Sequence, residues 1–227
     1  MISNVVVHNL KTGIERDTAI DEAVRVPLAV VFRTKPGALI IGIGAALLGI
    51  GSYSLMNSYT LTYGAAVLGF DYNELLLATT IGAVLQLVTI PLFGVLANRI
   101  GSARVVLIGA IGTLIVAFPI YFLLQSASFG VLVGMMIIGG ILPTMSWAAL
   151  GGLLSELFGA RIRYSAISFA YAIAAIASGV LLPLTYAFGA AVDQAWWHPG
   201  VVLAAMSLIT AVSAHFAGRR TLPVEES

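Results

Sequence analysis

The sequence predicts an all-α membrane protein, a bundle of six transmembrane helices. Of its 227 residues, 59% are hydrophobic and only 9% are charged, whereas an average soluble chain carries roughly 25% charged residues. An α-helix needs about 20 apolar residues to cross a bilayer, and lipid offers the backbone of other structures no hydrogen-bond partners. Six stretches near this length contain none of the charged residues: 37–63, 75–97, 105–124, 130–154, 166–190 and 200–217.

The predicted domain organisation is a cytoplasmic lead-in over residues 1–35, a membrane domain over 36–218 and a cytoplasmic tail over 219–227. The lead-in does not resemble a cleavable signal because polar residues interrupt each of its apolar runs, and a weak helix is expected from Thr18 to Val26. The connections between spans are short, so we expect successive helices to be antiparallel neighbours.

Basic residues lie only in alternate loops. All eleven stand before the first span, between the second and third, between the fourth and fifth, or after the sixth. By the positive-inside rule both termini are cytoplasmic, and the loops with Asp71, Glu74 and Asp193 are external. We therefore expect a multi-pass protein of the cell membrane, and the net charge of +1 argues against nucleic acid as a partner.

Small residues and prolines recur inside the spans. We expect most of the glycines to allow close helix packing: Gly42, Gly44, Gly49, Gly51, Gly109, Gly112, Gly130 and Gly134. Prolines 91, 119, 143 and 183 fall inside four spans, where each removes a backbone hydrogen bond and favours a kink.

The residue pattern argues against an enzyme. The three histidines, His8, His198 and His215, are predicted to lie in different compartments or depths and cannot share a metal site or a triad. There is no cysteine and no phosphate-binding glycine loop, so we expect neither a cofactor nor a metal. The six stretches also lack carboxylates, the usual proton relay of a pump or symporter.

Polar residues inside the spans are concentrated in the first. Tyr53, Asn57 and Thr60 follow i, i+4, i+7 spacing and are expected to share one face. A neighbouring stripe, further polar groups and two aromatic residues complete the set: Ser54, Ser58, Thr62, Gln86, Thr144, Ser146, Trp147, Ser168 and Tyr171. Either these groups form helix-to-helix hydrogen bonds or they face a cavity or another subunit.

One segment carries a family resemblance. Residues Gly94-Val95-Leu96-Ala97-Asn98-Arg99-Ile100-Gly101 resemble the G-x-L-A-D-R-x-G signature of the major facilitator superfamily. Leu61-Thr62-Tyr63, Ser155-Glu156-Leu157-Phe158-Gly159 with the following arginines, and Trp196-Trp197 are together similar to its metabolite:proton symporter family.

The resemblance implies the C-terminal six-helix half of a twelve-span transporter, with residues 1–35 similar to the end of the loop that joins the halves. Members of that family carry organic acids such as 2-oxoglutarate, citrate or shikimate, or osmolytes such as proline and betaine. The resemblance also implies a conformational motif in the cytoplasmic loops: Gly94, Asn98, Arg99, Gly101, Arg104, Glu156, Arg161 and Arg163.

The chain departs from the family pattern at several places. Asn98 replaces the Asp of the signature and Ser102-Ala103-Arg104 replaces its basic run, which weakens the charge contacts that the family uses between conformations. In the fourth span Ala148, Ala149 and Leu150 replace Gly-Pro-Gln, and in the fifth Ala172 replaces Gln, so two amides of the expected cavity are missing.

Two functions follow from this reading. The first is a contribution to proton-coupled transport of a small organic acid or osmolyte-type metabolite, together with a separate N-terminal half or a second copy in a parallel homodimer. The alternative is a truncated, non-transporting remnant or an assembly partner of another transporter. If a partner completes the cavity, we expect its substrate-binding wall here to comprise Tyr53, Asn57, Gln86, Trp147 and Tyr171.

Overall fold

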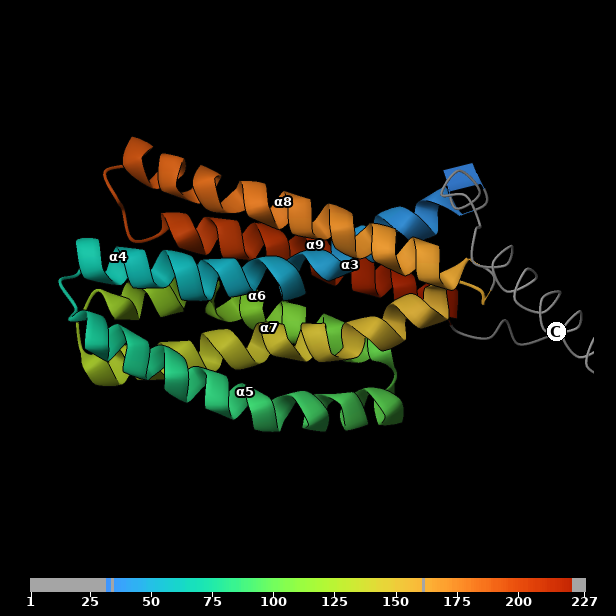
Figure 1. Ribbon diagram of the computed structural model, residues 1–227, viewed down its shortest axis with the longest axis horizontal. Helices are drawn as coiled ribbons and strands as arrows, with labels where there is room; N and C mark the ends of the chain where they lie inside the picture. The colour runs from blue at the N-terminus through green and yellow to red at the C-terminus, as the bar shows by residue number, and fades with distance from the viewer. Residues whose placement is uncertain (1–31, 34, 161, 222–227) are drawn as a thin grey trace, which may run out of the picture.

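The computed structural model describes residues 32–33, 35–160 and 162–221, and the described elements from Pro36 onward are helices (Figure 1). They are α3 (Pro36–Tyr53), η1 (Ser54–Tyr59), α4 (Thr60–Ala66), α5 (Tyr72–Ile100), α6 (Ser102–Leu124), α7 (Phe129–Leu157), α8 (Arg163–Ala191) and α9 (His198–Thr221). The first three form one continuous span, so six helical spans are long and apolar enough to cross a membrane, as the sequence predicts. The expected helix from Thr18 to Val26 lies outside the described residues.

The helices extend beyond the apolar stretches. α5 continues to Ile100 and α6 begins at Ser102, so a single residue, Gly101, joins them. Its φ of 94° lies in a region that residues with a side chain rarely adopt. α9 likewise includes the first residues of the expected tail and ends at Thr221. Polar residues at a helix end can stay helical because they reach interfacial water, so apolarity alone underestimates helix length.

A capping box begins α5 at the end of the bundle opposite the start of α3 and the end of α9. The backbone N–H of Asn73 donates to Oδ1 of Asp71 at 2.7 Å, and the N–H of Asp71 donates to Oε2 of Glu74 at 3.3 Å. These bonds satisfy orphan amides of the first turn, and both carboxylates complement the positive end of the helix dipole. Two of the acidic residues in the predicted external loops thus have a structural role.

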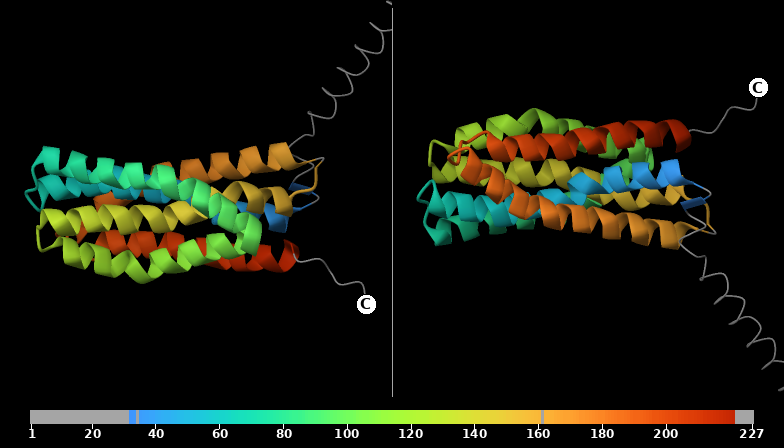
Figure 2. Two further views of the ribbon diagram at one scale, coloured as in Figure 1. Left: turned by 90° about the horizontal axis from the view of Figure 1, so that it is seen from below. Right: turned by 90° about the horizontal axis from the view of Figure 1, so that it is seen from above.

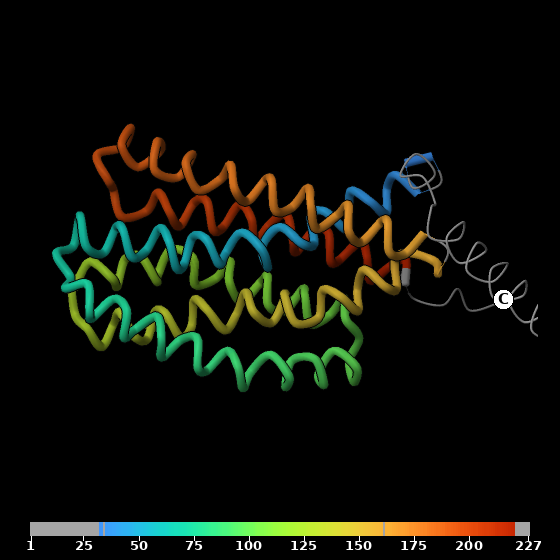
Figure 3. Tube along the Cα trace, viewed as in Figure 1, coloured from blue at the N-terminus to red at the C-terminus, as the bar shows by residue number. Residues whose placement is uncertain are grey.

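Helix packing differs from the order of the chain. Successive helices run antiparallel, as the trace shows (Figure 3), but among consecutive spans only α6 and α7 are major packing partners. α3 packs on three helices: α7, α8 and α9. α5 packs on α7. α6 packs on α9 as well as on α7, and α6 and α9 lie side by side along one face of the bundle (Figure 2). The expectation that successive helices are neighbours is therefore wrong for most pairs, because close contact follows the shape of the helix faces.

Glycines set several of these contacts. A Cβ on Gly109 would lie 2.8 Å from the carbonyl oxygen of Leu142 on α7, and one on Gly44 would collide with the hydroxyl of Ser213 on α9. Gly134, in contrast, has no neighbouring atom within 4 Å of that position. The prediction of close packing thus holds for the glycines of α3 and α6 but is wrong for Gly134. It is also wrong for Gly130, because the nearest atom to a Cβ built there is 3.9 Å away.

The four predicted intramembrane prolines lie inside α5, α6, α7 and α8. The core forms two apolar clusters, one toward each end of the bundle. α5 and α8 occupy opposite edges (Figure 1) and are the least buried spans. Their exposed surfaces are rich in Leu, Ile and Val, which suits contact with lipid or with another membrane domain.

Candidate functional site

A π-helical segment, η1, interrupts the second half of the first span. The hydroxyl of Thr60 donates to the carbonyl of Leu55, five residues earlier, at 3.1 Å. One extra residue in a turn rotates the following side chains by about 100°. Tyr53, which precedes η1, and Asn57, which lies within it, face a cavity, whereas Thr60, which follows it, is fully buried in the bundle. The prediction that all three share a face is therefore wrong for Thr60.

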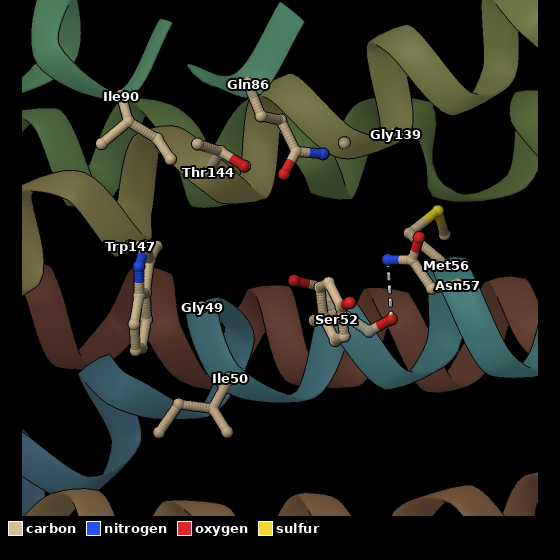
Figure 4. A pocket seen from close by; sticks show the side chains of 12 residues that line it. Gly49, Ile50, Ser52, Met56, Asn57, Gln86, Ile90, Gly139, Thr144 and Trp147 are labelled. Atoms are coloured by element: carbon tan, nitrogen blue, oxygen red, sulfur yellow. Dashed lines mark hydrogen bonds between the residues drawn. The ribbon is translucent and has the colours of Figure 1, made fainter. Parts of the chain in front are cut away.

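A cavity of about 410 Å³ lies between the first span, α5 and α7 (Figure 4). This volume is within the usual range of small-molecule sites. Its lining residues come from two consecutive spans and from the more distant α7: Gly49, Ile50, Ser52, Tyr53, Met56, Asn57, Gln86, Ile90, Gly139, Gly140, Thr144 and Trp147. Four of the five predicted substrate-binding residues belong to this set.

Two amides face each other across the cavity, that of Asn57 on η1 and that of Gln86 on α5 (Figure 4). Nδ2 of Asn57 donates to the backbone carbonyl of Tyr53 at 3.1 Å, so its amide oxygen remains an acceptor. A Cβ on Gly140 would lie 2.5 Å from Nε2 of Gln86, so the glycine leaves room for this amide. The two amides can donate to a carboxylate or accept from an ammonium group.

Trp147 lies at the cavity and stacks edge-on with a second aromatic residue outside it. Trp147 lines it and is 41% exposed, and the ring of Tyr171 meets the indole edge-on, with centroids 5.7 Å apart. Tyr171 is therefore the one predicted substrate-binding residue that does not line the cavity. It contacts the cavity only through the ring of Trp147. A Cβ on Gly49 would lie 3.3 Å from the Cα of Trp147, which explains how α7 comes so close to α3 at this level.

Several lining residues are not among the substrate-binding residues that the sequence predicts. Ser52 and Met56 project from the first span, Thr144 projects from α7, and Gly139 leaves space opposite Met56. Thr144 follows an intramembrane proline and is conspicuous in the sequence as a polar residue. The sequence does not predict that its side chain points into the cavity. For the glycine no chemical signal exists, because its contribution is the absence of a side chain.

The neighbouring polar stripe of the first span contacts α8. The hydroxyl of Tyr186 donates to Oγ1 of Thr62 at 3.0 Å and approaches the carbonyl of Ser58 at 3.4 Å. For these residues the structure supports the helix-to-helix alternative. The polar residues of this span therefore lie on two faces: one faces the cavity and the other faces α8.

The far side of η1 is anchored to the start of α9. His198 is fully buried; its Nδ1 lies 2.5 Å from the carbonyl oxygen of Ala195, and its Nε2 contacts the hydroxyl of Tyr59. A carbonyl oxygen can only accept, so Nδ1 carries the hydrogen and Nε2 accepts from the tyrosine. This bond holds the π-helical segment in place behind the cavity wall.

The residues of the expected conformational motif lie toward the end of the bundle where the described chain starts and finishes. Asn98, Arg99 and Arg104 are exposed, while Glu156 accepts a hydrogen bond of 2.7 Å from the hydroxyl of Ser102. Nε of Arg163 donates to the carbonyl of Phe158 at 3.3 Å, just past the end of α7. Of the other motif residues, Gly94 and Gly101 have open space at the Cβ position and Arg161 lies outside the described residues.

Within the described ranges, no three His, Cys, Asp or Glu side chains converge in a way that could hold a metal ion. The chemistry that the cavity offers is therefore that of amides, hydroxyls and aromatic faces. Such groups recognise a small polar molecule through hydrogen bonds and ring contacts.

Comparison with known proteins gives a family match over most of the chain. The family model described as Major Facilitator Superfamily matches residues 41–226. No solved structure matches the chain significantly.

Curated relatives are transport proteins. The chain is 27% identical over 192 residues to the shikimate transporter of Escherichia coli (strain K12) and 26% identical over 204 residues to the inner membrane metabolite transport protein YhjE of the same strain. Each alignment covers 84% of this chain and 44% of the relative. A putative proline/betaine transporter of Staphylococcus aureus (strain COL) is 31% identical over 131 residues, which are 57% of this chain and 28% of that protein. The chain thus spans less than half the length of the relatives that it matches.

Proposed function

The chain belongs to the major facilitator superfamily, and on this premise we propose that it acts as the C-terminal half of a secondary active transporter. In this proposal it contributes to proton-coupled transport of a small organic acid or osmolyte-type metabolite. The observation that carries the proposal is the cavity between the first span, α5 and α7. Halves of this superfamily are related by an axis along the membrane normal, with the substrate site near the midplane between them. One half provides one wall of such a site.

The chemistry of the wall supports a small polar solute. Its polar lining consists of the amides Asn57 and Gln86 and the hydroxyls Ser52, Tyr53 and Thr144, with no charged side chain in the described lining. Shikimate, proline and betaine, named in the relatives, are small polar molecules of this kind. A net charge on the substrate would be balanced by the other wall.

Proton coupling is assigned to the partner. In the described part of the chain the spans carry carboxylates only in their end turns, at Glu74 and Glu156. A carboxylate that exchanges a proton at mid-membrane would then belong to a separate N-terminal half. A parallel homodimer is the other admissible assembly, because the axis relating two halves can become a true twofold.

The proposed orientation has both termini on the cytoplasmic side of the cell membrane. Arg99, Arg104 and Arg163 lie near the end of α5 and the starts of α6 and α8, while Asp71 caps the start of α5 and Asp193 follows the end of α8. The first set of helix ends is on the side where α3 begins and α9 ends, and the second set is on the opposite side (Figure 1). Positive residues are retained on the cytoplasmic side during insertion.

Binding by the chain reconstituted with a partner half tests the site. Labelled shikimate, proline and betaine are offered to the parent, to Asn57→Ala and Tyr53→Ala, and to the control Ser155→Ala, whose hydroxyl bonds the carbonyl of Gly151 in its own helix and does not line the cavity. We expect weaker binding for the two cavity variants with nearly unchanged melting temperatures, because Tyr53 is 67% exposed and Asn57 bonds its own helix. Reduced stability with intact affinity would mean that this polar face is structural and that the proposed site is wrong.

Reconstitution tests the assembly. Vesicles that hold the chain alone should show no concentrative uptake under a proton gradient, and uptake should require a six-helix N-terminal half with an intramembrane Asp or Glu. Accumulation by this chain alone would overturn the assignment of the carboxylate to a partner half. Absence of both binding and uptake in every pairing would favour the alternative, a non-transporting remnant or assembly partner.

A further inference from the structure

A second cavity, of about 380 Å³, lies at the end of the bundle that carries the arginine-rich loops. It is formed by the start of α3 and the ends of α7 and α9, and shares no lining residue with the first cavity. Its described lining is Lys35, Pro36, Gly37, Ala38, Glu156, Leu157 and Arg220. The proposed transport function makes no use of it.

Positive groups converge at this cavity. Lys35 is the N-cap residue of α3, its side chain makes no capping hydrogen bond, and the first turn contains no acidic residue. A Cβ built on Gly37 would lie 3.2 Å from both terminal nitrogens of Arg220, so the missing side chain lets this guanidinium lie against the first turn. Cations normally favour the C-terminal end of a helix, because the N-terminal end is itself positive. Lys35 and Arg220 therefore meet a helix end of their own sign.

The cavity faces one helix N-terminus and one carboxylate. The N–H of Leu39 bonds the carbonyl of Lys35 at 3.1 Å at the start of α3, so the lining residues Lys35 to Ala38 form the positive end of this helix. Glu156 is the acidic member of the described lining, and its carboxylate already accepts from the hydroxyl of Ser102 on α6. One carboxylate does not balance two cations and a helix N-terminus, so an anion between them would be stabilised.

We propose that this cavity binds the phosphate group of an anionic lipid headgroup at the cytoplasmic surface of the membrane. The guanidinium of Arg220 and the ammonium of Lys35 would donate to the phosphate oxygens. The cavity lies where three membrane helices begin or end, and its lining residues Pro36, Ala38 and Leu157 would supply apolar contacts for the glycerol end of the lipid. Basic pockets between transmembrane helices on the cytoplasmic side are suited to such headgroups.

The test measures binding of short-chain phosphatidylglycerol and phosphatidylcholine to the full chain in neutral detergent by native mass spectrometry. The site variant is Lys35→Gln with Arg220→Gln. The control is Arg99→Gln with Arg104→Gln, which removes the same charge from exposed positions of the same end outside the cavity. We expect the parent to prefer phosphatidylglycerol, the site variant to bind it at least about tenfold more weakly, and the control to stay within about twofold of the parent.

Two further measurements distinguish a lipid headgroup from free phosphate and a loss of binding from a loss of folding. Inorganic phosphate should compete only weakly, because it lacks the glycerol contacts; strong saturable binding of phosphate without lipid binding would overturn the lipid assignment. Arg220→Lys, which keeps the charge, should retain most of the binding and the parent's melting temperature. Equal loss in the site and control variants, or equal binding of both lipids by the parent, would mean a diffuse surface attraction and would refute the site.

Discussion

Replacing Gly109 by alanine tests the close contact between α6 and α7. In the structure the new Cβ would lie 2.7 Å from Oγ of Ser146, 2.8 Å from the carbonyl oxygen of Leu142 and 2.9 Å from the backbone nitrogen of Ser146. Two of these atoms are backbone and cannot rotate away. The helices would have to separate by about 0.6 Å to restore an ordinary contact of 3.4 Å, a shift that forfeits about a quarter of the attraction of each affected atom pair.

The cost of this shift has two parts. Overpacking of a well-packed interior costs about 1–3 kcal/mol. The hydroxyl of Ser146 donates to the carbonyl of Val106 at 3.0 Å across the same contact, and an interhelical hydrogen bond in a membrane contributes about 0.6 kcal/mol. The higher helix propensity of alanine stabilises the helix by up to about 1 kcal/mol and offsets part of this loss of stability. We therefore expect Gly109→Ala to lower the free energy of unfolding by about 1–3 kcal/mol.

Gly134→Ala is the matched control, because the same substitution in α7 meets no atom within 4 Å. It should leave stability unchanged or raise it by up to about 1 kcal/mol. Equilibrium unfolding in mixed micelles, followed by the fluorescence of the three tryptophans, measures both variants. Equal stability of Gly109→Ala and the parent, or equal losses in the two variants, would refute the packing argument.

Two further predictions concern the anchor of η1 and the topology. Tyr59→Phe removes the donor to Nε2 of the fully buried His198 and should cost about 1–3 kcal/mol, whereas Tyr53→Phe, at an exposed hydroxyl, should be neutral in the same unfolding assay; equal effects would contradict the role of the histidine bond. Single cysteines at Asn73 and at Ser126 in this cysteine-free chain should react with an impermeant thiol reagent in intact cells, while one at Asn98 should react only after permeabilisation. The reverse pattern would invert the proposed orientation.

Part of the site could be predicted from the sequence, because a polar group inside an apolar stretch is conspicuous. Tyr53, Asn57, Gln86 and Trp147 were recognisable in this way, and they line one cavity. The rotation of Thr60 out of this face was not predictable, since the i, i+4 rule assumes a regular helix and η1 is not one. Gly139 and Gly140 shape the cavity by lacking side chains, which has no signature in a sequence full of glycines.

The sequence by itself determined the six spans, the prolines within four of them and the segregation of charge between the two ends. These properties are local. In lipid the backbone of each span must make its hydrogen bonds within its own helix, so a span is a run of consecutive apolar residues and can be read from the sequence. Only the tertiary structure decided that α3 packs on α7, α8 and α9, that Gly109 makes a helix contact while Gly134 does not, and that Lys35 and Arg220 meet at one cavity. In a membrane nearly every face of a helix is apolar, so hydrophobicity cannot select the partner. Partner choice depends on the fit of side chains between segments far apart in the chain, and that fit exists only once the helices have packed.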